Sequence, residues 1–252
     1  MQIAIERIDQ SLFGNKTVHL DNLDLTSLPP LPKGLIRINC SYNRLTSLPP
    51  LPDGLIELYC TENQLTSLPE LPSSLRIINC SNNSLSSLPE FPSYLLHVEC
   101  MFNQLTILPL LPPYLRELNV KYNNLTVLPD LPSILNILLC GGNRLTSLPP
   151  LPHMLQVLDC TFNSLETLPE LPSTLFALHC KLPYNEQYYA SYTLTPNLVQ
   201  QLNRENEEWM ESHNRRRCVK RCGQYKEEIM MKVWRPSRVL QLLEMGYDVE
   251  DM

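Results

Sequence analysis

Residues 35–54 read LIRINCSYNRLTSLPPLPDG, and residues 55–74 repeat the same pattern as LIELYCTENQLTSLPELPSS. The pattern continues to Cys180 with a period of twenty residues and without an insertion or a deletion. A strict period of this size means that each unit buries its apolar edge mainly against its two neighbours. The sequence therefore predicts a solenoid.

Three kinds of residue recur at fixed places in the unit. Within the first unit, the alternation of Ile38, Asn39 and Cys40 is typical of a strand with one buried side. The L-P-x-L-P run that follows removes backbone donors and fixes φ, so the return segment cannot be a regular helix and should be extended and polyproline-like. We therefore expect an α/β-type solenoid dominated by β structure, in which about eight parallel strands line a concave sheet. The fixed residues are Leu35, Leu55, Leu75, Leu95, Leu115, Leu135, Leu155 and Leu175; Cys40, Cys60, Cys80, Cys100, Val120, Cys140, Cys160 and Cys180; and Asn43, Asn63, Asn83, Asn103, Asn123, Asn143 and Asn163.

The cysteines of the repeat are expected to be buried thiols. Of the nine cysteines in the chain, seven occupy one position of the unit. Side chains stacked one above the next in parallel strands are poorly placed for the geometry that a disulfide needs. Cysteine also behaves as a small apolar residue. We expect reduced thiols and a reducing compartment.

The unit L-x-x-L-x-C-x-x-N-x-L resembles the leucine-rich repeat in its shortest form. Segments such as Asn63–Pro72 and Asn143–Pro152, which read N-x-L-T-S-L-P-x-L-P, are similar to the LPX-type repeats of bacterial effector proteins of the IpaH and YopM kind. The resemblance covers about residues 20–182. It implies a curved, protein-binding solenoid.

The chain divides into three parts. Residues 1–17 form an N-terminal flanking or capping segment, residues 18–183 form the solenoid, and residues 184–252 form a mainly helical segment. A degenerate first unit carries Leu23 where asparagine belongs, and Pro183 takes that position at the other end. In the last segment, helices are expected over about residues 196–217, 224–234 and 236–245.

Four positions of each unit are expected to face outward on the concave sheet: the two that flank the central strand residue, and the two before the asparagine. The aromatic residues among them anchor an interface, or they only pack on one another along the ladder; the sequence leaves both interpretations open. An apolar patch forms near the C-terminal end. The predicted protein-binding residues are Tyr42, Tyr59, Glu62, His97, Glu99, Phe102, Glu117, Lys121, Tyr122, Ile137, Leu139, Val157, Asp159, Phe162 and His179.

Charge and composition argue against several other functions. The net charge of −6 disfavours a nucleic-acid partner, and no signal peptide or apolar span is visible. His213, Cys218 and Cys222 are too few for a structural zinc site. The basic run at residues 215–221 is flanked by glutamates, which favours a solvated helix face. A catalytic role for Cys218, as in the ubiquitin-ligase domains of IpaH effectors, is disfavoured because the segment is too short and offers no apparent base.

The tail EEIMMKVWRPSRVLQLLEMGYDVEDM, residues 227–252, resembles a C-terminal segment of proteins of giant amoeba-infecting viruses of the mimivirus family. The resemblance implies a viral, intracellular protein, most simply in the host cytoplasm. We expect a monomeric, non-enzymatic module without cofactor or metal that binds a host or viral protein on its concave face. The alternatives are a substrate adaptor in ubiquitin transfer and a structural component of the virion.

Overall fold

The computed structural model describes residues 2–12, 16–180, 190–193, 199–200 and 204. One helix precedes a single ten-stranded sheet whose strands lie in chain order. The elements are α1 (Gln2–Leu12), β1 (Thr17–His19), β2 (Arg37–Asn39), β3 (Glu57–Tyr59), β4 (Ile77–Asn79), β5 (His97–Glu99), β6 (Glu117–Asn119), β7 (Ile137–Leu139), β8 (Val157–Asp159), β9 (Ala177–Cys180) and β10 (Ala190–Thr193).

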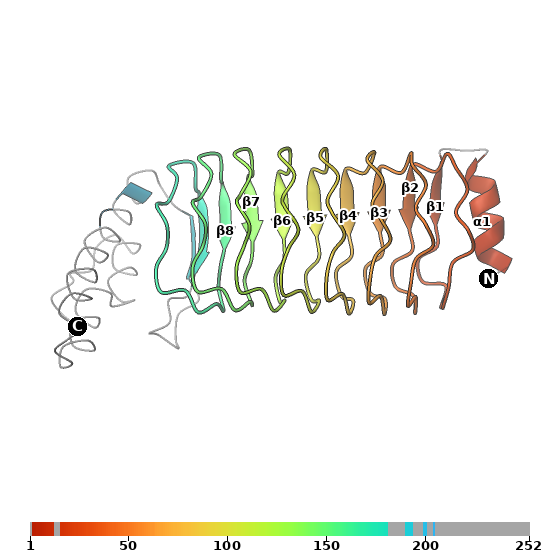
Figure 1. Ribbon diagram of the computed structural model, residues 1–252, viewed down its shortest axis with the longest axis horizontal. Coiled ribbons are helices and arrows are strands. Elements are labelled where there is room, and N and C mark those ends of the chain that lie inside the picture. Colours follow the sequence, from red (N-terminus) through yellow and green to blue (C-terminus); the bar gives the residue numbers. More distant parts are fainter. Residues whose placement is uncertain (1, 13–15, 181–189, 194–198, 201–203, 205–252) are drawn as a thin grey trace.

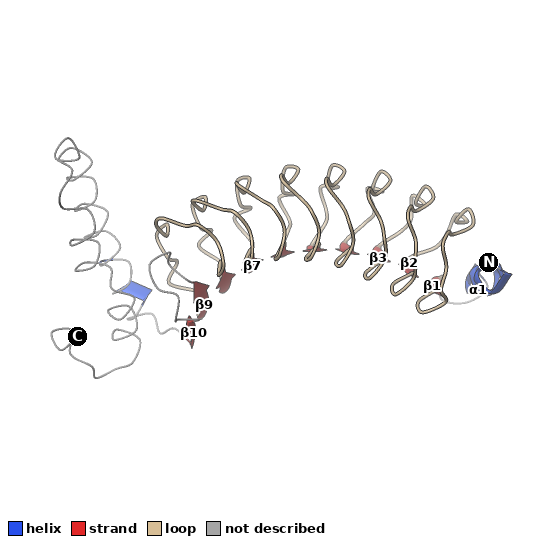
Figure 2. Ribbon diagram, turned by 90° about the horizontal axis from the view of Figure 1, so that it is seen from below, coloured by secondary structure: helices blue, strands red, loops and turns tan. Residues whose placement is uncertain are grey.

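The strands from β1 to β9 pair in parallel, each shifted from its neighbour by one repeat. Ile38 lies opposite Leu58, and Leu58 lies opposite Ile78. The coils form an arc with the strands on its inner side and the return segments on its outer side (Figures 1 and 2). Within residues 16–180 the return segments contain no regular helix. The predicted solenoid is therefore confirmed, although the degenerate first unit adds β1 to the eight strands expected from the strict repeats.

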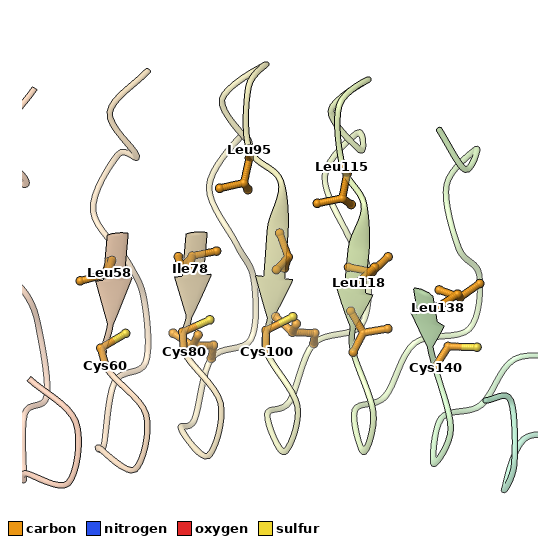
Figure 3. Packing of buried hydrophobic residues seen from close by; sticks show 14 of the residues in the cluster. Leu58, Cys60, Ile78, Cys80, Leu95, Cys100, Leu115, Leu118, Leu138 and Cys140 are labelled. Carbon is orange, nitrogen blue, oxygen red and sulfur yellow. The ribbon is translucent and has the colours of Figure 1, made fainter. Parts of the chain in front are cut away.

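The core is a set of identical columns along the solenoid. Leu35, Ile38 and Cys40 of the first full unit are completely buried, and so are their counterparts Leu55, Leu58 and Cys60 in the next. Figure 3 shows these columns, with the cysteines stacked at the ends of successive strands. Val120 is also fully buried in place of a cysteine, since a side chain of similar size and polarity fills the same space.

Both ends of the parallel sheet are covered. α1 packs against β1 and buries Ala4 and Ile8, which are four residues apart and therefore lie on one face of a helix. β10 pairs antiparallel with β9. Neither α1 nor β10 was predicted from the sequence. Covering an edge strand satisfies backbone groups that would otherwise pair with another chain.

The rest of the C-terminal segment lies outside the described residues. This holds for the three helices that we expect over residues 196–245, apart from the short stretches named above, and for the candidate ligands His213, Cys218 and Cys222. The segment boundaries and its mainly helical character therefore stay predictions.

We predict that the thiols of the repeat are unreactive in the folded protein. All seven are free, and all but the half-buried Cys180 are buried. Burial raises the pKa of the Cys40 thiol to about 12 and that of Cys160 well above its ordinary value, so little thiolate forms near neutral pH. In a Cys218→Ser/Cys222→Ser background at pH 8, a thiol-specific reagent such as DTNB should modify at most Cys180 at an appreciable rate. Fast modification of more thiols before a denaturant is added would contradict this.

Candidate functional site

The concave face is made of strand residues that alternate with the core. In β3, Leu58 is buried while Glu57 and Tyr59 remain half-buried on the other side. The predicted residues His97, Glu117, Leu139, Val157 and His179 likewise lie half-buried on this face, and Glu99 lies exposed on it. The structure thus places the predicted strand residues on a single surface.

The N-terminal part of this face is polar and internally paired. The guanidinium of Arg37 donates to Glu57, and the Tyr59 hydroxyl donates to the same carboxylate at 2.9 Å. Burial acts to raise the pKa of Glu57, but these two hydrogen bonds outweigh it and the pKa is lowered. His97 Nδ1 lies 3.2 Å from Glu117 Oε2. Groups that are already paired offer little binding energy to a partner.

Apolar side chains gather on β7 and β8. Ile137 lies opposite Val157 in the parallel register, and Leu139 is two residues farther along the same face of β7. All three are only partly buried. We call Ile137, Leu139 and Val157 the aliphatic cluster. Ile77 occupies the same position of its own repeat as Ile137, but its strand neighbours at that position are Glu57 and His97.

The chain leaves each strand in a left-handed turn, which we call the trailing rim. Tyr42, Glu62, Phe102, Tyr122 and Phe162 lie on it with φ between 51° and 57°. Left-handed backbone is unfavourable for bulky residues, by about 1–2 kcal/mol each. The repeat imposes this conformation through its hydrogen bonds, such as that from Tyr122 N to Gly141 O at 2.8 Å. The aromatic side chains on this rim are therefore not explained by local backbone preference.

Two of these aromatic residues stack on one another. The ring centroids of Phe102 and Tyr122 are 4.4 Å apart, with the planes inclined by 6°. Packing along the ladder, one of the two sequence interpretations, is therefore realised for this pair. Both side chains still remain exposed, by 44% and 39%, so the stack also presents an apolar surface to solvent.

Gly141 and Gly142 let side chains from neighbouring repeats cross the trailing rim. A Cβ on Gly142 would lie 2.5 Å from the Tyr122 ring, and a Cβ on Gly141 would lie 2.9 Å from both Asp159 Oδ1 and Thr161 Oγ1. Lys121 Nζ reaches across to Asp159 Oδ2 at 2.7 Å, although the two residues are 38 positions apart. This ion pair therefore spans two repeats.

Several positions that were expected to face outward are in fact buried. Asp159 is only 7% exposed, and Ser41, Ser81 and Thr161 are also buried. Asp159 is covered because Lys121 and Thr161 both hydrogen-bond to its carboxylate. Burial acts to raise the pKa of Asp159, but the hydrogen bonds from Lys121 and Thr161 outweigh it and the pKa is lowered. Asp159 therefore orders the face rather than offering a free charge.

A second set of exposed aromatic residues was missed from the sequence. The chain enters each strand at what we call the leading rim, which includes residues 73–76, 93–96 and 113–116. Tyr94 and Tyr114 stack there with centroids 5.3 Å apart. The sequence does carry a signal for these two residues. The position before the first leucine of the unit changes to tyrosine at 94 and 114, whereas it holds glycine or serine in the earlier repeats, at Gly34, Gly54 and Ser74.

Nothing in the described part of the chain forms a metal centre. No group of three or more His, Cys, Asp or Glu side chains is arranged there to hold an ion. No helix among the described residues has the length and apolar character that a bilayer span requires. The features that the structure does offer are surfaces of side chains on a regular scaffold.

A twenty-residue unit of strand and extended return, stacked around columns of leucine, defines a leucine-rich repeat solenoid. Residues 74–95 match the family described as Leucine Rich Repeat. The solved structure of a Shigella effector LRR domain is similar at 31% identity and a TM-score of 0.52, over 72% of this chain and 74% of that one. The chain belongs to the leucine-rich repeat family, whose solenoids are generally protein-interaction modules rather than enzymes.

Two structures of the effector YopM are also similar. YopM from Yersinia enterocolitica WA-314 matches at 39% identity with a TM-score of 0.69, over 72% of this chain. The leucine-rich effector YopM from Yersinia pestis matches at 31% identity with a TM-score of 0.51, over 73% of this chain and 65% of that one. The present chain spans only 42% of the length of the Yersinia enterocolitica chain. None of the curated protein sequences matches this chain closely enough to count as a relative.

Proposed function

We propose that this protein binds a partner protein on the C-terminal half of its concave face. The observation that carries the proposal is the aliphatic cluster, in which three apolar side chains lie together and partly exposed on a face whose N-terminal part is mostly polar and paired. Apolar side chains that remain open to solvent on a rigid surface are typical anchors of an interface.

The surroundings of the cluster suit a binding site of this kind. The Phe102–Tyr122 stack lies on the trailing rim of the two repeats that precede β7, and the Lys121–Asp159 ion pair joins the repeats that carry Tyr122 and Val157. Side chains that are ordered before binding lose less conformational entropy when a partner docks. The partner is therefore expected to place an apolar segment on β7 and β8.

We further propose that the protein is viral and acts in the host cytoplasm on a host or viral partner. The support is the resemblance of residues 227–252 to tails of giant-virus proteins. The effector structures similar to the solenoid are consistent with a protein that acts on other proteins.

The double substitution Tyr122→Glu/Leu139→Lys is expected to abolish capture of the partner from an extract of amoebal host cells. Two charged residues in the centre of an apolar interface would have to lose their hydration when the partner docks, at a cost of several kcal/mol. Affinity purification with quantitative mass spectrometry would measure the loss, with circular dichroism to verify the fold.

The matched control is Ile77→Glu set against Ile137→Glu. Both residues occupy the same position of the repeat, so both changes place a carboxylate at the same point of the scaffold. Only Ile137 lies in the aliphatic cluster, and only its substitution should weaken capture. If the double variant still retained the same proteins as the wild type, the concave-face proposal would be wrong.

A further inference from the structure

The leading rim carries an ordered ladder of arginine and tyrosine. Leu96 N donates to Arg76 O, and Arg116 N donates to Leu96 O, both at 2.8 Å, so these residues stack on successive rungs. Tyr94 and Tyr114 lie beside them. These tyrosines precede β5 and β6, whereas Phe102 and Tyr122 follow the same two strands. In Figure 3 this rim lies toward Leu95 and Leu115, and the cysteines mark the other ends of the strands.

The tyrosines are stacked, exposed and held in place. The planes of Tyr94 and Tyr114 are inclined by only 8°, and the side chains are 56% and 48% exposed. The Arg76 guanidinium lies 5.2 Å from the centroid of the Tyr94 ring. Its Nη1 also donates to the carbonyl oxygens of Ser73, Ser74 and Leu75 at 3.2, 2.7 and 3.1 Å. Because these bonds use only Nη1, the Nη2 and Nε groups of Arg76 remain available to donate to an acceptor on a partner.

The two arginines of this rim are not neutralised by an ion pair within the described residues. In the part of the chain that the structure describes, neither Arg76 nor Arg116 has a carboxylate partner, whereas Arg37 and Lys121 each have one. Residues 73–76, 93–96 and 113–116 contain no aspartate or glutamate. The nearest carboxylate in sequence, Glu117, lies 3.2 Å from His97 on the concave face. A protein with a net charge of −6 thus presents a local cationic and aromatic surface.

We propose that the Arg76–Tyr94–Tyr114–Arg116 ladder is a second docking surface, which binds an extended acidic peptide segment of a partner protein. Arginine forks suit carboxylates because they can donate two parallel hydrogen bonds. An apolar residue between the carboxylates rests on the two tyrosine rings and Leu96. This surface shares no residue with the aliphatic cluster.

The spacing of the ladder selects the spacing of the acidic residues. Arg76 and Arg116 are two rungs apart, and rungs of a sheet lie about 4.8 Å apart, so their backbones are separated by roughly 10 Å. A peptide in the extended polyproline II conformation advances about 3.1 Å per residue with three residues per turn, so its side chains at i and i+3 point to the same side, roughly 9 Å apart. The peptide that fits best therefore carries carboxylates at positions i and i+3.

A nucleic-acid strand fits the same rim less well. Glu117 on β6 directly follows Arg116, and its carboxylate would repel a continuous run of phosphates. Two arginines over this length also give few phosphate contacts, on which the affinity of such binding depends. The observations therefore favour a short acidic segment with gaps between its charges.

The test uses fluorescein-labelled peptides and the full-length protein, with fluorescence anisotropy at physiological ionic strength. The probe GGELYEGG carries glutamates at i and i+3, and GGEELYGG carries them side by side. We expect the first to bind at least about 10-fold more tightly than the second, which corresponds to about 1.4 kcal/mol. The Arg76→Glu/Arg116→Glu variant should lose this binding, while Arg44→Glu/Arg144→Glu, which makes the same charge change at two exposed positions outside the ladder, should retain it.

The outcomes separate this inference from the proposed function. The Tyr122→Glu/Leu139→Lys variant should bind the peptide as the wild type does, whether or not it captures the concave-face partner. No measurable peptide binding at millimolar concentration would overturn the inference, as would equal binding by wild type and the double arginine variant. Tighter binding of a single-stranded oligonucleotide than of GGELYEGG, lost in the same variant, would assign the rim to nucleic acid instead.

Discussion

Replacing Asn123 with alanine is expected to lower the free energy of unfolding by about 3 kcal/mol. The Asn123 side chain is buried between repeats. Its Oδ1 accepts a hydrogen bond from Leu105 N at 3.0 Å, and its Nδ2 donates to the carbonyl oxygens of Cys100, Val120 and Lys121 at 3.0, 3.1 and 3.3 Å. Alanine would leave the buried Leu105 amide without its acceptor, at about 1–3 kcal/mol. It would also remove one of the two hydrogen bonds to the Cys100 carbonyl, to which Asn103 Nδ2 still donates at 3.2 Å.

The neighbouring residue provides the control for this prediction. Asn124 is only half-buried, and no hydrogen bond of its side chain is found within the described residues. Asn124→Ala should change the free energy of unfolding by less than about 0.5 kcal/mol. Urea unfolding followed by circular dichroism would measure both variants. Equal midpoints for Asn123→Ala and Asn124→Ala would show that the asparagine column does not hold the repeats together.

Gly142→Ala is expected to destabilise the protein by about 2–3 kcal/mol, mostly through Tyr122. The backbone of Gly142 has φ +70, and a left-handed alanine costs roughly 1 kcal/mol. The equivalent positions in neighbouring repeats hold tyrosine and phenylalanine at similar φ, so the fold can impose that cost. The larger part arises because the new Cβ would lie 2.5 Å from the Tyr122 ring, which would force the ring off the rim and off Phe102.

Two comparisons separate the free-energy cost of the left-handed backbone from the cost of the contact between residue 142 and the Tyr122 ring. Gly34 also has a positive φ, +95, but a Cβ there would meet nothing within 4 Å, so Gly34→Ala should show the backbone cost alone. In a double-mutant cycle by urea unfolding, Gly142→Ala should cost much less when Tyr122 is already alanine, with a coupling of about 1–2 kcal/mol. Additive effects would refute the contact between the ring and residue 142.

Most of the scaffold could be predicted from the sequence because every unit of the repeat packs against its neighbours in the same way. The leucine and cysteine columns repeat without a shift of register, so one assignment of inward and outward positions applies to every strand. The ends could not be predicted in this way. α1 and β10 have no counterpart elsewhere in the chain, so no second copy reveals which of their residues are buried.

The candidate surfaces were predicted only in part. The strand positions of the concave face follow from alternation, so the placement of Ile137, Leu139 and Val157 on one face could be predicted; their role in binding stays a prediction. Asp159 was misplaced because its burial depends on Lys121, 38 residues away, and on the missing side chain of Gly141. Tyr94 and Tyr114 were missed because the leading rim precedes the strand, where the alternation does not yet apply.

The sequence by itself determined the period, the buried columns, the strand positions and the extended return of this leucine-rich repeat solenoid. These properties depend on contacts between each residue and its counterpart twenty positions away. In a strict repeat those counterparts can be identified directly from the sequence. Only the tertiary structure decided which outward positions meet one another across two repeats, as Lys121 and Asp159 do, and which aromatic residues stack. Those outcomes depend on the size and direction of individual side chains on the curved sheet, which vary from unit to unit while the period stays constant.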